Sequence, residues 1–371
     1  MKVIIIINFI SPIRVFLFNK LNTYFSNKNQ ELKVLFLSET DKNRNWEREK
    51  NIEFQYEILD NFAIRSKRKD LNTFFINPKI NKLLNKENPD KIICFGWDHF
   101  VAYAANRWAR KNQKEFVLWS GSTINEKSWR RTVFNPLVKY LVKRTNHFIA
   151  YGTRAKEYLI ILGAAEQNIE IFYNTIDIDY FQKEIKNFSE TKKQDLKNKL
   201  GITSSKVILF NGQLIERKGI FELLEGYNQY KQKDSDISLL MIGGGQEKTR
   251  INRTINEGDI KDVILVDFIQ YRNVYKYYAI SDMLILPSRE EVWGLVINEA
   301  LACGLPVITT NKVGASADLV ENGKNGYIIK VNCSDCINKA ISLIFKNNLH
   351  IQNNSKKVLC KTKVEKQWKI I

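Results

Sequence analysis

Two glutamates separated by eight positions, Glu291 and Glu299, are the residues whose type and spacing best suit chemistry at a bound ligand. They lie in the segment PSREEVWGLVINEALACGLPVITTNKVGASAD, residues 287–318. Gly294, between them, allows the backbone to approach a ligand closely. Free N–H groups at the start of a helix there would form an anion site. Eight helical residues span roughly 12 Å, so the two carboxylates could serve two ends of one elongated ligand.

The elements that must position these glutamates can be predicted from the flanking residues. The apolar run Met283–Leu286 predicts a buried strand that ends at Pro287. Leu295–Cys303 has apolar residues at helical spacing, and Gly304 and Pro306 stop that helix. The alternative is an ordinary strand–helix unit whose glutamates lie on the surface.

This segment resembles the E-x7-E signature of the retaining glycosyltransferases of family 4, which have the GT-B fold. The matching residues are Pro287, Ser288, Glu291, Gly294, Glu299, Ala300, Gly304, Pro306 and Val307. In that family the second glutamate, here Glu299, binds the ribose hydroxyls of a nucleotide sugar. The first, here Glu291, contacts the donor sugar, which makes it a catalytic candidate. The resemblance is strong over residues 205–330 and weak over residues 1–150.

A basic stretch, Asn211–Gly219, follows a predicted strand and opens a helix. It is similar to the phosphate-binding G-R-x-x-x-x-K-G element of the family. Lys218 and Gly219 match the element, which implies that Lys218 is catalytic and stabilises the departing diphosphate. Arg217, adjacent to Lys218, is the second catalytic candidate, because it could compensate for a missing arginine. Gln213 stands at the usual arginine position, and a neutral amide cannot replace a bidentate arginine. The alternative is a solvated basic helix start.

The other donor contacts also follow from the resemblance. A glycine turn ends one predicted strand, and backbone groups near Phe268 and Ile269 would receive the nucleobase. Asp267 stands where a glycine is commoner, which leaves the base preference open. The implied donor-binding residues are Gly212, Gln213, Gly243, Gly244, Phe268, Ile269, Val292, Trp293, Gly294, Leu295 and Glu299.

Asp177 and Asp179 form a D-x-D triplet, which holds a divalent cation in metal-dependent glycosyltransferases. Here the triplet resembles the interdomain turn of family 4 instead. A helix N-terminus and cationic side chains can balance a diphosphate without a metal. We expect no metal and no other cofactor.

Candidates on the acceptor side are Arg14, His99, Ser120 and Glu126. Relatives often carry a histidine near the reacting sugar, and Ser120 occupies that position here, so no catalytic histidine is assigned. Arg14 lies in the first predicted loop and His99 follows a later strand. For both residues a structural role is the alternative.

Strand-like runs alternate with helix-length segments, which predicts α/β layers. Two blocks of similar size predict two Rossmann-like domains facing a cleft, the GT-B arrangement, with ligands at the carboxyl ends of strands. The predicted parts are an acceptor-binding domain at 1–181, a charged linker at 182–204, a nucleotide-sugar donor-binding domain at 205–355, and a C-terminal segment at 356–371 that could return to the first domain.

Cysteine use and hydropathy indicate a cytoplasmic protein. The five cysteines have irregular spacings, so no disulfide framework is expected. Cys333 and Cys336 form a lone C-x-x-C, for which a zinc or redox site is the minor alternative. The apolar run Val3–Ile7 is too short for a signal peptide and predicts a buried first strand. No stretch approaches the ~18 apolar residues that span a bilayer.

The formal net charge of +18 over 371 residues fits phosphorylated substrates, an anionic membrane or nucleic acid as partners. Part of this excess is attributable to a composition rich in Lys, Asn and Ile. Two basic runs stand out, residues 65–69 and residues 130–144. The second alternates with apolar residues and predicts a helix that can lie on anionic lipid. The alternative is a normal helix that packs its apolar face on the sheet.

Together these features favour a retaining glycosyltransferase that moves a sugar from a nucleotide-sugar donor to a glycan acceptor. The resemblance implies a lipid-linked acceptor in capsule or lipopolysaccharide synthesis, with peripheral attachment to the inner face of the membrane. A nucleotide-sugar epimerase is one alternative, which the scarcity of histidines disfavours. A nucleic-acid-binding protein is another, but no basic-aromatic recognition module is present, so no nucleic acid is expected as a partner.

Overall fold

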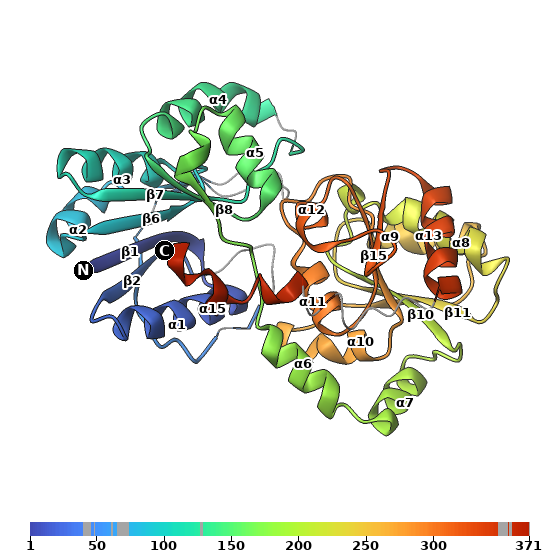
Figure 1. Cartoon of the computed structure of the whole chain (residues 1–371). Helices are drawn as coiled ribbons and strands as arrows, with labels where there is room; N and C mark the ends of the chain where they lie inside the picture. Colours follow the sequence, from blue (N-terminus) through green and yellow to red (C-terminus); the bar gives the residue numbers. More distant parts are fainter. Residues whose placement is uncertain are drawn as a thin grey trace. The chain divides into compact units, whose positions relative to one another are not determined.

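The computed structural model describes residues 1–39, 46–47, 49–60, 62–64, 74–126, 129–347, 355 and 358–370. The chain forms two compact units (Figure 1). The first consists of Met1–Asn174 and Val364–Ile371, and the second of Thr175–Lys363. Each unit contains its own parallel sheet, which confirms the predicted α/β class with two Rossmann-like halves.

The first unit is built on seven strands in the order β3-β2-β1-β6-β7-β8-β9. These strands are β1 (Lys2–Phe9), β2 (Glu31–Ser38), β3 (Gln55–Ile58), β6 (Lys91–Phe95), β7 (Glu115–Ser120), β8 (His147–Ala150) and β9 (Ile169–Ile171). The helices are α1 (Pro12–Ser26), α2 (Ile80–Glu87), α3 (Phe100–Lys111), α4 (Trp129–Val142), α5 (Thr153–Ile161) and α15 (Val364–Gln367), with short 3-10 turns η1 (Glu166–Asn168) and η4 (Trp368–Ile370). A separate antiparallel pair joins β4 (Phe62–Ile64) and β5 (Phe74–Ile76).

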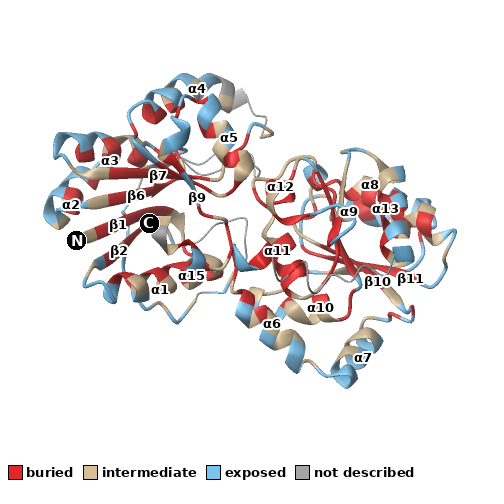
Figure 2. Cartoon of the chain, viewed as in Figure 1, coloured by how far each residue is buried: buried red, intermediate tan, exposed pale blue. Residues whose placement is uncertain are grey.

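Strand β1 is buried on both faces, which explains its unbroken apolar run. Val3 and Ile5 pack in a core that includes α1 residues, whereas Ile4 and Ile6 pack in a second core with residues of α2 and α3. Figure 2 shows β1, β6 and β7 of this sheet coloured mostly as buried. A parallel strand covered on both faces needs apolar residues at every position.

The second unit is built on six parallel strands in the order β12-β11-β10-β13-β14-β15. These are β10 (Lys206–Asn211), β11 (Ile237–Ile242), β12 (Val263–Val266), β13 (Met283–Leu286), β14 (Val307–Thr310) and β15 (Gly326–Ile329). The helices are α6 (Ile178–Asn187), α7 (Glu190–Lys199), α8 (Ile220–Lys231), α9 (Lys248–Glu257), α10 (Tyr275–Ala279), α11 (Leu295–Ala302), α12 (Ser316–Leu319) and α13 (Ser334–Asn347), with 3-10 turns η2 (Glu216–Lys218) and η3 (Tyr271–Asn273).

The boundary between the units lies earlier than the sequence suggested. The second unit begins at Thr175 rather than after residue 181, and the predicted linker at 182–204 forms most of α6 and α7. Phe181 is fully buried against the rings of Tyr271 and Tyr278, so α6 packs within the second unit. The polar α7 is capped by Ser189, whose hydroxyl accepts from the Lys192 N–H.

The C-terminal residues belong to the first unit. Val364 is buried in the same core as β1 and α1. Gln367 exchanges hydrogen bonds with the backbone of Tyr173, accepting from its N–H and donating to its carbonyl.

The structure corrects the expectation about cysteines at one site. Cys333 and Cys336 form a disulfide at the start of α13, with their Cα atoms 5.2 Å apart. The i, i+3 spacing at a helix start brings two Cα atoms within the 4.4–6.8 Å range that a disulfide spans. Cys94, Cys303 and Cys360 are free cysteines.

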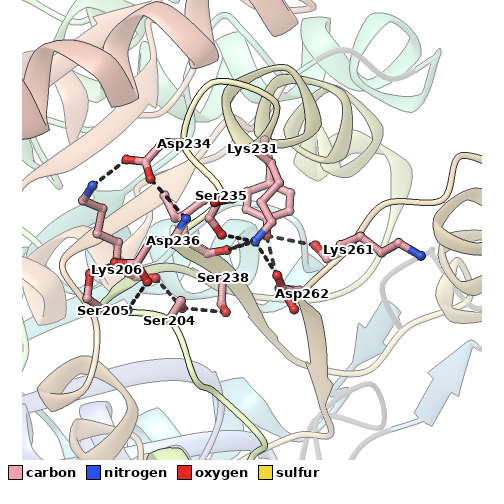
Figure 3. A network of polar contacts seen from close by, with 12 residues as sticks. Ser204, Ser205, Lys206, Lys231, Asp234, Ser235, Asp236, Ser238, Lys261 and Asp262 are labelled. Carbon is pink, nitrogen blue, oxygen red and sulfur yellow. Dashed lines mark hydrogen bonds and ion pairs between the residues drawn. The ribbon is translucent and has the colours of Figure 1, made fainter.

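A polar network closes the amino-terminal edge of the second sheet (Figure 3). Lys231 at the end of α8 forms an ion pair with Asp262 and donates to the carbonyl oxygens of Ser235 at 2.6 Å and Ile237 at 2.8 Å. The hydroxyl of the buried Tyr227 lies 3.0–3.2 Å from the carbonyl oxygens of Ile237, Lys261 and Asp262. These contacts satisfy backbone groups where β11 and β12 begin.

Replacing Tyr227 with phenylalanine should lower the free energy of unfolding by about 1–3 kcal/mol, because buried carbonyls lose a donor. The midpoint of urea unfolding measures this loss. Tyr140→Phe is the matched control, because Tyr140 is 50% exposed. An unchanged midpoint for Tyr227→Phe would contradict the prediction that this network stabilises the fold.

Candidate active site

The second sheet reverses its strand order between β10 and β13, which are hydrogen-bonded neighbours. From β10 the chain continues to β11 and β12 on one side, and from β13 to β14 and β15 on the other. The two strands are parallel, so the loops after them lie at the same edge of the sheet. Open α/β sheets bind ligands at such switch points. The loops 212–219 and 287–294, which hold most of the predicted site residues, therefore come together.

Two glycines let these loops pack closely. Gly219 has φ +70°, and a Cβ there would lie 2.2 Å from the carbonyl oxygen of Pro287. Gly294 has φ +92°, and its Cβ would meet the side chains of Val313 at 2.9 Å and Leu286 at 3.1 Å. The room left by the missing Cβ of Gly294 is therefore filled by the protein's own side chains, and the approach of a ligand to the backbone there stays a prediction.

Lys218 and Glu291 form an ion pair across the two loops. Their side chains are 11% and 16% exposed. The backbone of Glu291 is held in turn, since its carbonyl accepts from the Gly314 N–H at 3.0 Å and its N–H donates to the Lys312 carbonyl at 3.3 Å. The structure thus joins the two residues predicted to handle the diphosphate and the sugar.

Arg217 lies beside this pair and is exposed. Its Nη1 donates to the carbonyl oxygen of Glu290 at 3.0 Å. Arg217 is therefore held to the loop that carries Glu291 while its side chain remains exposed.

Glu299 is buried in α11, only 5% exposed. Its carboxylate accepts from the Tyr278 hydroxyl at 2.7 Å and from the Asn211 amide at 3.4 Å. Burial raises the pKa of Glu299 to about 7, and the Tyr278 hydrogen bond opposes part of that rise. Burial also raises the pKa of the neighbouring Cys303 thiol, with the Glu299 charge as a smaller cause. The alternative of two surface glutamates is wrong, because Glu299 is buried and Glu291 is nearly so.

Sequence reasoning missed Asn211 and Tyr278 as partners of Glu299. Asn211 is the last residue of β10, and that position at a switch point was the available signal. Tyr278 lies on α10, and no sequence spacing links it to Glu299, so only the fold brings them together.

The other predicted donor residues lie in the turns after β10, β11 and β12 and in the loop that follows Glu291. Gly212 and Gln213 follow β10, and a Cβ on Gly243 would lie 1.9 Å from the Gly212 carbonyl, so the turn after β11 packs on the turn after β10. Gly244 beside it is exposed. Phe268, 38% exposed, and Ile269 follow β12.

Val292 and Trp293 follow Glu291 directly, and Gly294 and Leu295 come next. The ring of Trp293 is 3% exposed, and its indole N–H donates to Asn298 at 2.9 Å. The side chain of Trp293 is therefore part of the core, which leaves only its backbone for contact with a donor.

Arg14 is the best-defined candidate of the first unit. Its Nη2 donates to the Tyr151 hydroxyl at 2.6 Å, and its guanidinium lies 5.1 Å from the centre of the Phe95 ring and 5.3 Å from that of Tyr151. Phe95 ends β6 and Tyr151 follows β8, so Arg14 is fixed at the carboxyl edge of the first sheet.

The other first-unit candidates are more buried. His99 is the N-cap residue of α3 without a side-chain cap bond, and burial lowers its pKa to about 4, so the imidazole is neutral near pH 7. Ser120 is 1% exposed and accepts from the Ser122 N–H at 3.2 Å. Glu126 accepts from the Thr123 N–H at 2.6 Å and pairs with Arg131 at 3.2 Å. Ser120 and Glu126 thus organise the loop after β7.

Both aspartates of the D-x-D triplet have structural partners. Asp177 caps α6 by accepting from the Tyr180 N–H at 3.0 Å, and Asp179 pairs with Lys363 at 2.6 Å. Within the described ranges, no group of three or more His, Cys, Asp or Glu side chains is placed to hold a metal ion.

Residues 192–358 match the family described as "Glycosyl transferases group 1". The N-acetyl-alpha-D-glucosaminyl L-malate synthase of Bacillus anthracis is 30% identical over 278 residues, which cover 73% of this chain and 70% of that enzyme. The chain belongs to the group 1 glycosyl transferase family. The capsular polysaccharide biosynthesis glycosyltransferase CapM of Staphylococcus aureus is 28% identical over 213 residues, or 53% of each chain. The matched stretch thus spans about half the length of CapM and of other curated relatives.

Solved structures of glycosyltransferases share the fold of the whole chain. Anabaena Alr3699/HepE, crystallised with UDP, has a TM-score of 0.79 at 16% identity and covers 100% of this chain and 98% of its own. This likeness, with the two parallel sheets, confirms the predicted GT-B fold.

Proposed function

We propose that this group 1 family member is a retaining glycosyltransferase of family 4 that transfers a sugar from a nucleotide-sugar donor to a glycan acceptor. The observation that carries the proposal is the cluster at the β10–β13 switch point, where a buried carboxylate (Glu299) and a cation–carboxylate pair (Lys218 and Glu291) meet. To bind a nucleotide sugar, a site needs a hydrogen-bond acceptor for the ribose hydroxyls, cations for the diphosphate and a polar group for the sugar.

Each residue then has a distinct role. Glu299, oriented by Tyr278 and Asn211, accepts hydrogen bonds from the ribose hydroxyls. Lys218 and Arg217 bind the diphosphate and stabilise the charge that develops as it leaves. Glu291 contacts the donor sugar and, through its ion pair, keeps the ammonium of Lys218 in place. The bound donor must share Lys218 with Glu291.

Similar proteins support the donor and acceptor classes. HepE has been solved with UDP and with UDP-glucose, and CapM is named for capsular polysaccharide biosynthesis. We propose an acceptor among the glycans of surface polysaccharide assembly, as the name of CapM suggests. That the acceptor is carried on a lipid is part of the proposal and comes from the family resemblance.

A panel of nucleoside diphosphates and nucleotide sugars, headed by UDP and UDP-glucose, tests the donor class. Ligands that bind the folded protein raise its melting temperature by mass action. We expect the nucleotides of one base to raise the melting temperature and the matching nucleoside, at equal concentration, to leave it unchanged. If no nucleotide in the panel raises the melting temperature, the proposed function fails.

Product analysis separates transfer from epimerisation. A transferase releases nucleoside diphosphate from the donor and does so faster with its acceptor. An epimerase converts the nucleotide sugar into its epimer with no acceptor present and releases no diphosphate. Nuclear magnetic resonance of the donor after incubation distinguishes the two.

Transfer should persist in EDTA. Lys218, Arg217 and the N–H groups at the start of α11 supply the positive charge that a divalent ion supplies elsewhere. The rate of nucleoside diphosphate release with and without EDTA measures this. Loss of the activity in EDTA and its return with manganese would show that a metal is required.

We further propose that the first unit contacts an anionic membrane surface through α4. Val138, Leu141 and Val142 are buried, whereas Val133, Phe134 and Tyr140 are 61%, 45% and 50% exposed. The exposed cations of this helix and the turn after it are Lys139, Lys143 and Arg144, and the Arg144 guanidinium lies 3.8 Å from the centre of the Tyr140 ring.

The interpretation as a packed helix holds for the inner face of α4, and the composition of the outer face supports the proposed membrane contact. The inner face packs in the core of the first unit, and the outer face combines apolar and cationic groups, as interfacial helices do. The side chain of Arg130 and the basic run 65–69 lie outside the described residues. Among the helices that the structure describes, none is long and apolar enough to cross a membrane.

Reversing the charges of Lys139, Lys143 and Arg144 to glutamate should weaken binding to phosphatidylglycerol vesicles by about 100-fold or more, since each of the three cations near such a surface contributes about 1 kcal/mol. High salt should weaken the wild type similarly. Cosedimentation measures both effects. Reversal of Lys186, Lys192 and Lys199 on α6 and α7 is the control with the same charge change. Equal losses in both variants would mean that net charge alone drives binding.

A further inference from the structure

The two loops of the candidate active site are tied by contacts beyond the Lys218–Glu291 pair. The Arg289 N–H donates to the Arg217 carbonyl at 2.8 Å, and the Arg217 side chain donates to the Glu290 carbonyl at 3.0 Å. Arg217 and Arg289 thus link the loops in both directions, one position before Lys218 and two positions before Glu291.

The side chain of Arg289 extends these ties to the start of α8. Its Nε donates to Glu222 at 3.1 Å, its Nη2 donates to the same carboxylate oxygen, and its Nη1 lies 3.3 Å from the carboxylate of Glu216. The side chains of Arg289 and Glu222 are 35% and 14% exposed. Arg289 therefore bridges the η2 turn, the first turn of α8 and the loop after β13.

The position of the two carboxylates makes this bridge relevant to an anion. Glu216 and Glu222 flank the stretch 217–219, which carries both proposed diphosphate-binding cations. Two bare carboxylates so close to a diphosphate would repel it. The Arg289 guanidinium supplies positive charge that offsets part of theirs. The bond to the Arg217 carbonyl comes from the main-chain N–H of residue 289 and does not depend on this side chain.

We propose that Arg289 is a positioning residue for the diphosphate of the donor, acting through Arg217, Lys218, Glu216 and Glu222. The inference rests on the proposed function and deepens it. The Arg289 side chain ties the η2 turn and the first turn of α8 to the loop after β13 and offsets part of the charge of the two carboxylates beside it. Glu299 is held separately by Tyr278 and Asn211, so the part of the site proposed for the nucleoside does not depend on Arg289.

This division predicts a split in affinity. Loss of Arg289 should weaken binding of a nucleoside diphosphate more than binding of the monophosphate with the same base. A general loss of stability would weaken both ligands alike. The ratio of the two affinities therefore reports positioning, and a merely structural role would leave it unchanged.

The test is titration calorimetry with UDP and UMP, or with the corresponding pair for whichever base the wild type binds best. Arg289→Gln should lower the diphosphate-to-monophosphate affinity ratio by about tenfold, equivalent to one charge-assisted contact. Arg289→Lys, which keeps the charge, should recover part of the ratio. Lys206→Gln is the control, because Lys206 pairs with Asp234 at the opposite edge of the same sheet with similar exposure.

An unchanged ratio in a folded Arg289→Gln variant overturns the inference and leaves the proposed function standing. If Arg289→Gln does not fold, the Arg289→Lys variant provides the test, because a lysine cannot bridge Glu216 and Glu222 with a planar fork. Arg289→Lys must then lower the diphosphate-to-monophosphate affinity ratio measurably, and a ratio equal to that of the wild type would overturn the inference. A wild type that binds neither member of any nucleotide pair overturns the proposed function itself.

Discussion

Replacing Lys218 with alanine should lower the turnover number for sugar transfer by about 10²–10³-fold. A preorganised group aimed at charge that develops in the transition state is worth about that much. The loss is larger than for a solvated cation, because Lys218 is 9% exposed and fixed against Glu291. The variant also leaves the Glu291 carboxylate near the diphosphate with its cationic partner removed. Initial rates of nucleoside diphosphate release at saturating donor measure the effect.

Lys218→Arg should retain a large part of the rate, because it keeps the charge at that position. Glu291→Gln separates the two partners of the pair. Since Glu291 shares Lys218 with the donor, its neutral variant should bind nucleoside diphosphate at least as tightly as the wild type while transferring sugar more slowly. A folded Lys218→Ala variant with a wild-type turnover number would remove Lys218 from the mechanism.

Local sequence signals were sufficient for the elements that carry the site. The run Met283–Leu286 is strand β13 with the predicted bounds, and the helix predicted for Leu295–Cys303 is α11, Leu295–Ala302. Both have strong patterns because a buried parallel strand and a buried helix need apolar residues and are ended by Pro or Gly. The rule that parallel strands gather their loops at one edge explains why the loops of Lys218 and Glu291 come together, but the ion pair between them was not predicted.

Contacts between distant segments could not be predicted in this way. Tyr278 and Asn211 reach Glu299 from other elements, and Arg289 reaches Glu222 over 67 positions. No periodicity encodes such pairs. The charged stretch 182–204 was interpreted as a linker because polar composition is typical of linkers, but the burial of Phe181 and the cap at Ser189 make α6 and α7 stable parts of the second unit.

Replacing Glu299 with alanine should weaken nucleotide binding by about 10–100-fold, since each hydrogen bond to a charged group contributes about 1.5–3 kcal/mol. The carboxylate is already oriented by Tyr278 at 2.7 Å, so a ribose meets a preformed acceptor. Titration calorimetry with UDP-glucose measures the loss. Unchanged affinity in a folded variant would show that Glu299 does not bind the ribose. Leu319→Val, a buried volume change in the same unit, controls for indirect effects on packing.

The pH dependence of binding gives the same residue a second signature. Burial raises the pKa of Glu299 from 4.5 to about 7, so between these values the folded state holds a proton that the unfolded state has lost. The charge on Glu299 therefore makes the protein less stable as pH rises through that window. Ribose hydroxyls donate to the ionised form of Glu299, so bound nucleotide favours deprotonation. The affinity for nucleotide should therefore rise with pH, by up to about tenfold per unit below pH 7, and then level off.

UDP-glucose suits the measurement, because its diphosphate diester does not titrate near neutral pH. His99, with a pKa of about 4, is neutral throughout the window. Glu299→Gln should bind more weakly and with an affinity independent of pH. A wild-type affinity that stays flat from about pH 5.5 to about pH 8 would show that nucleotide binding does not depend on the ionisation of Glu299.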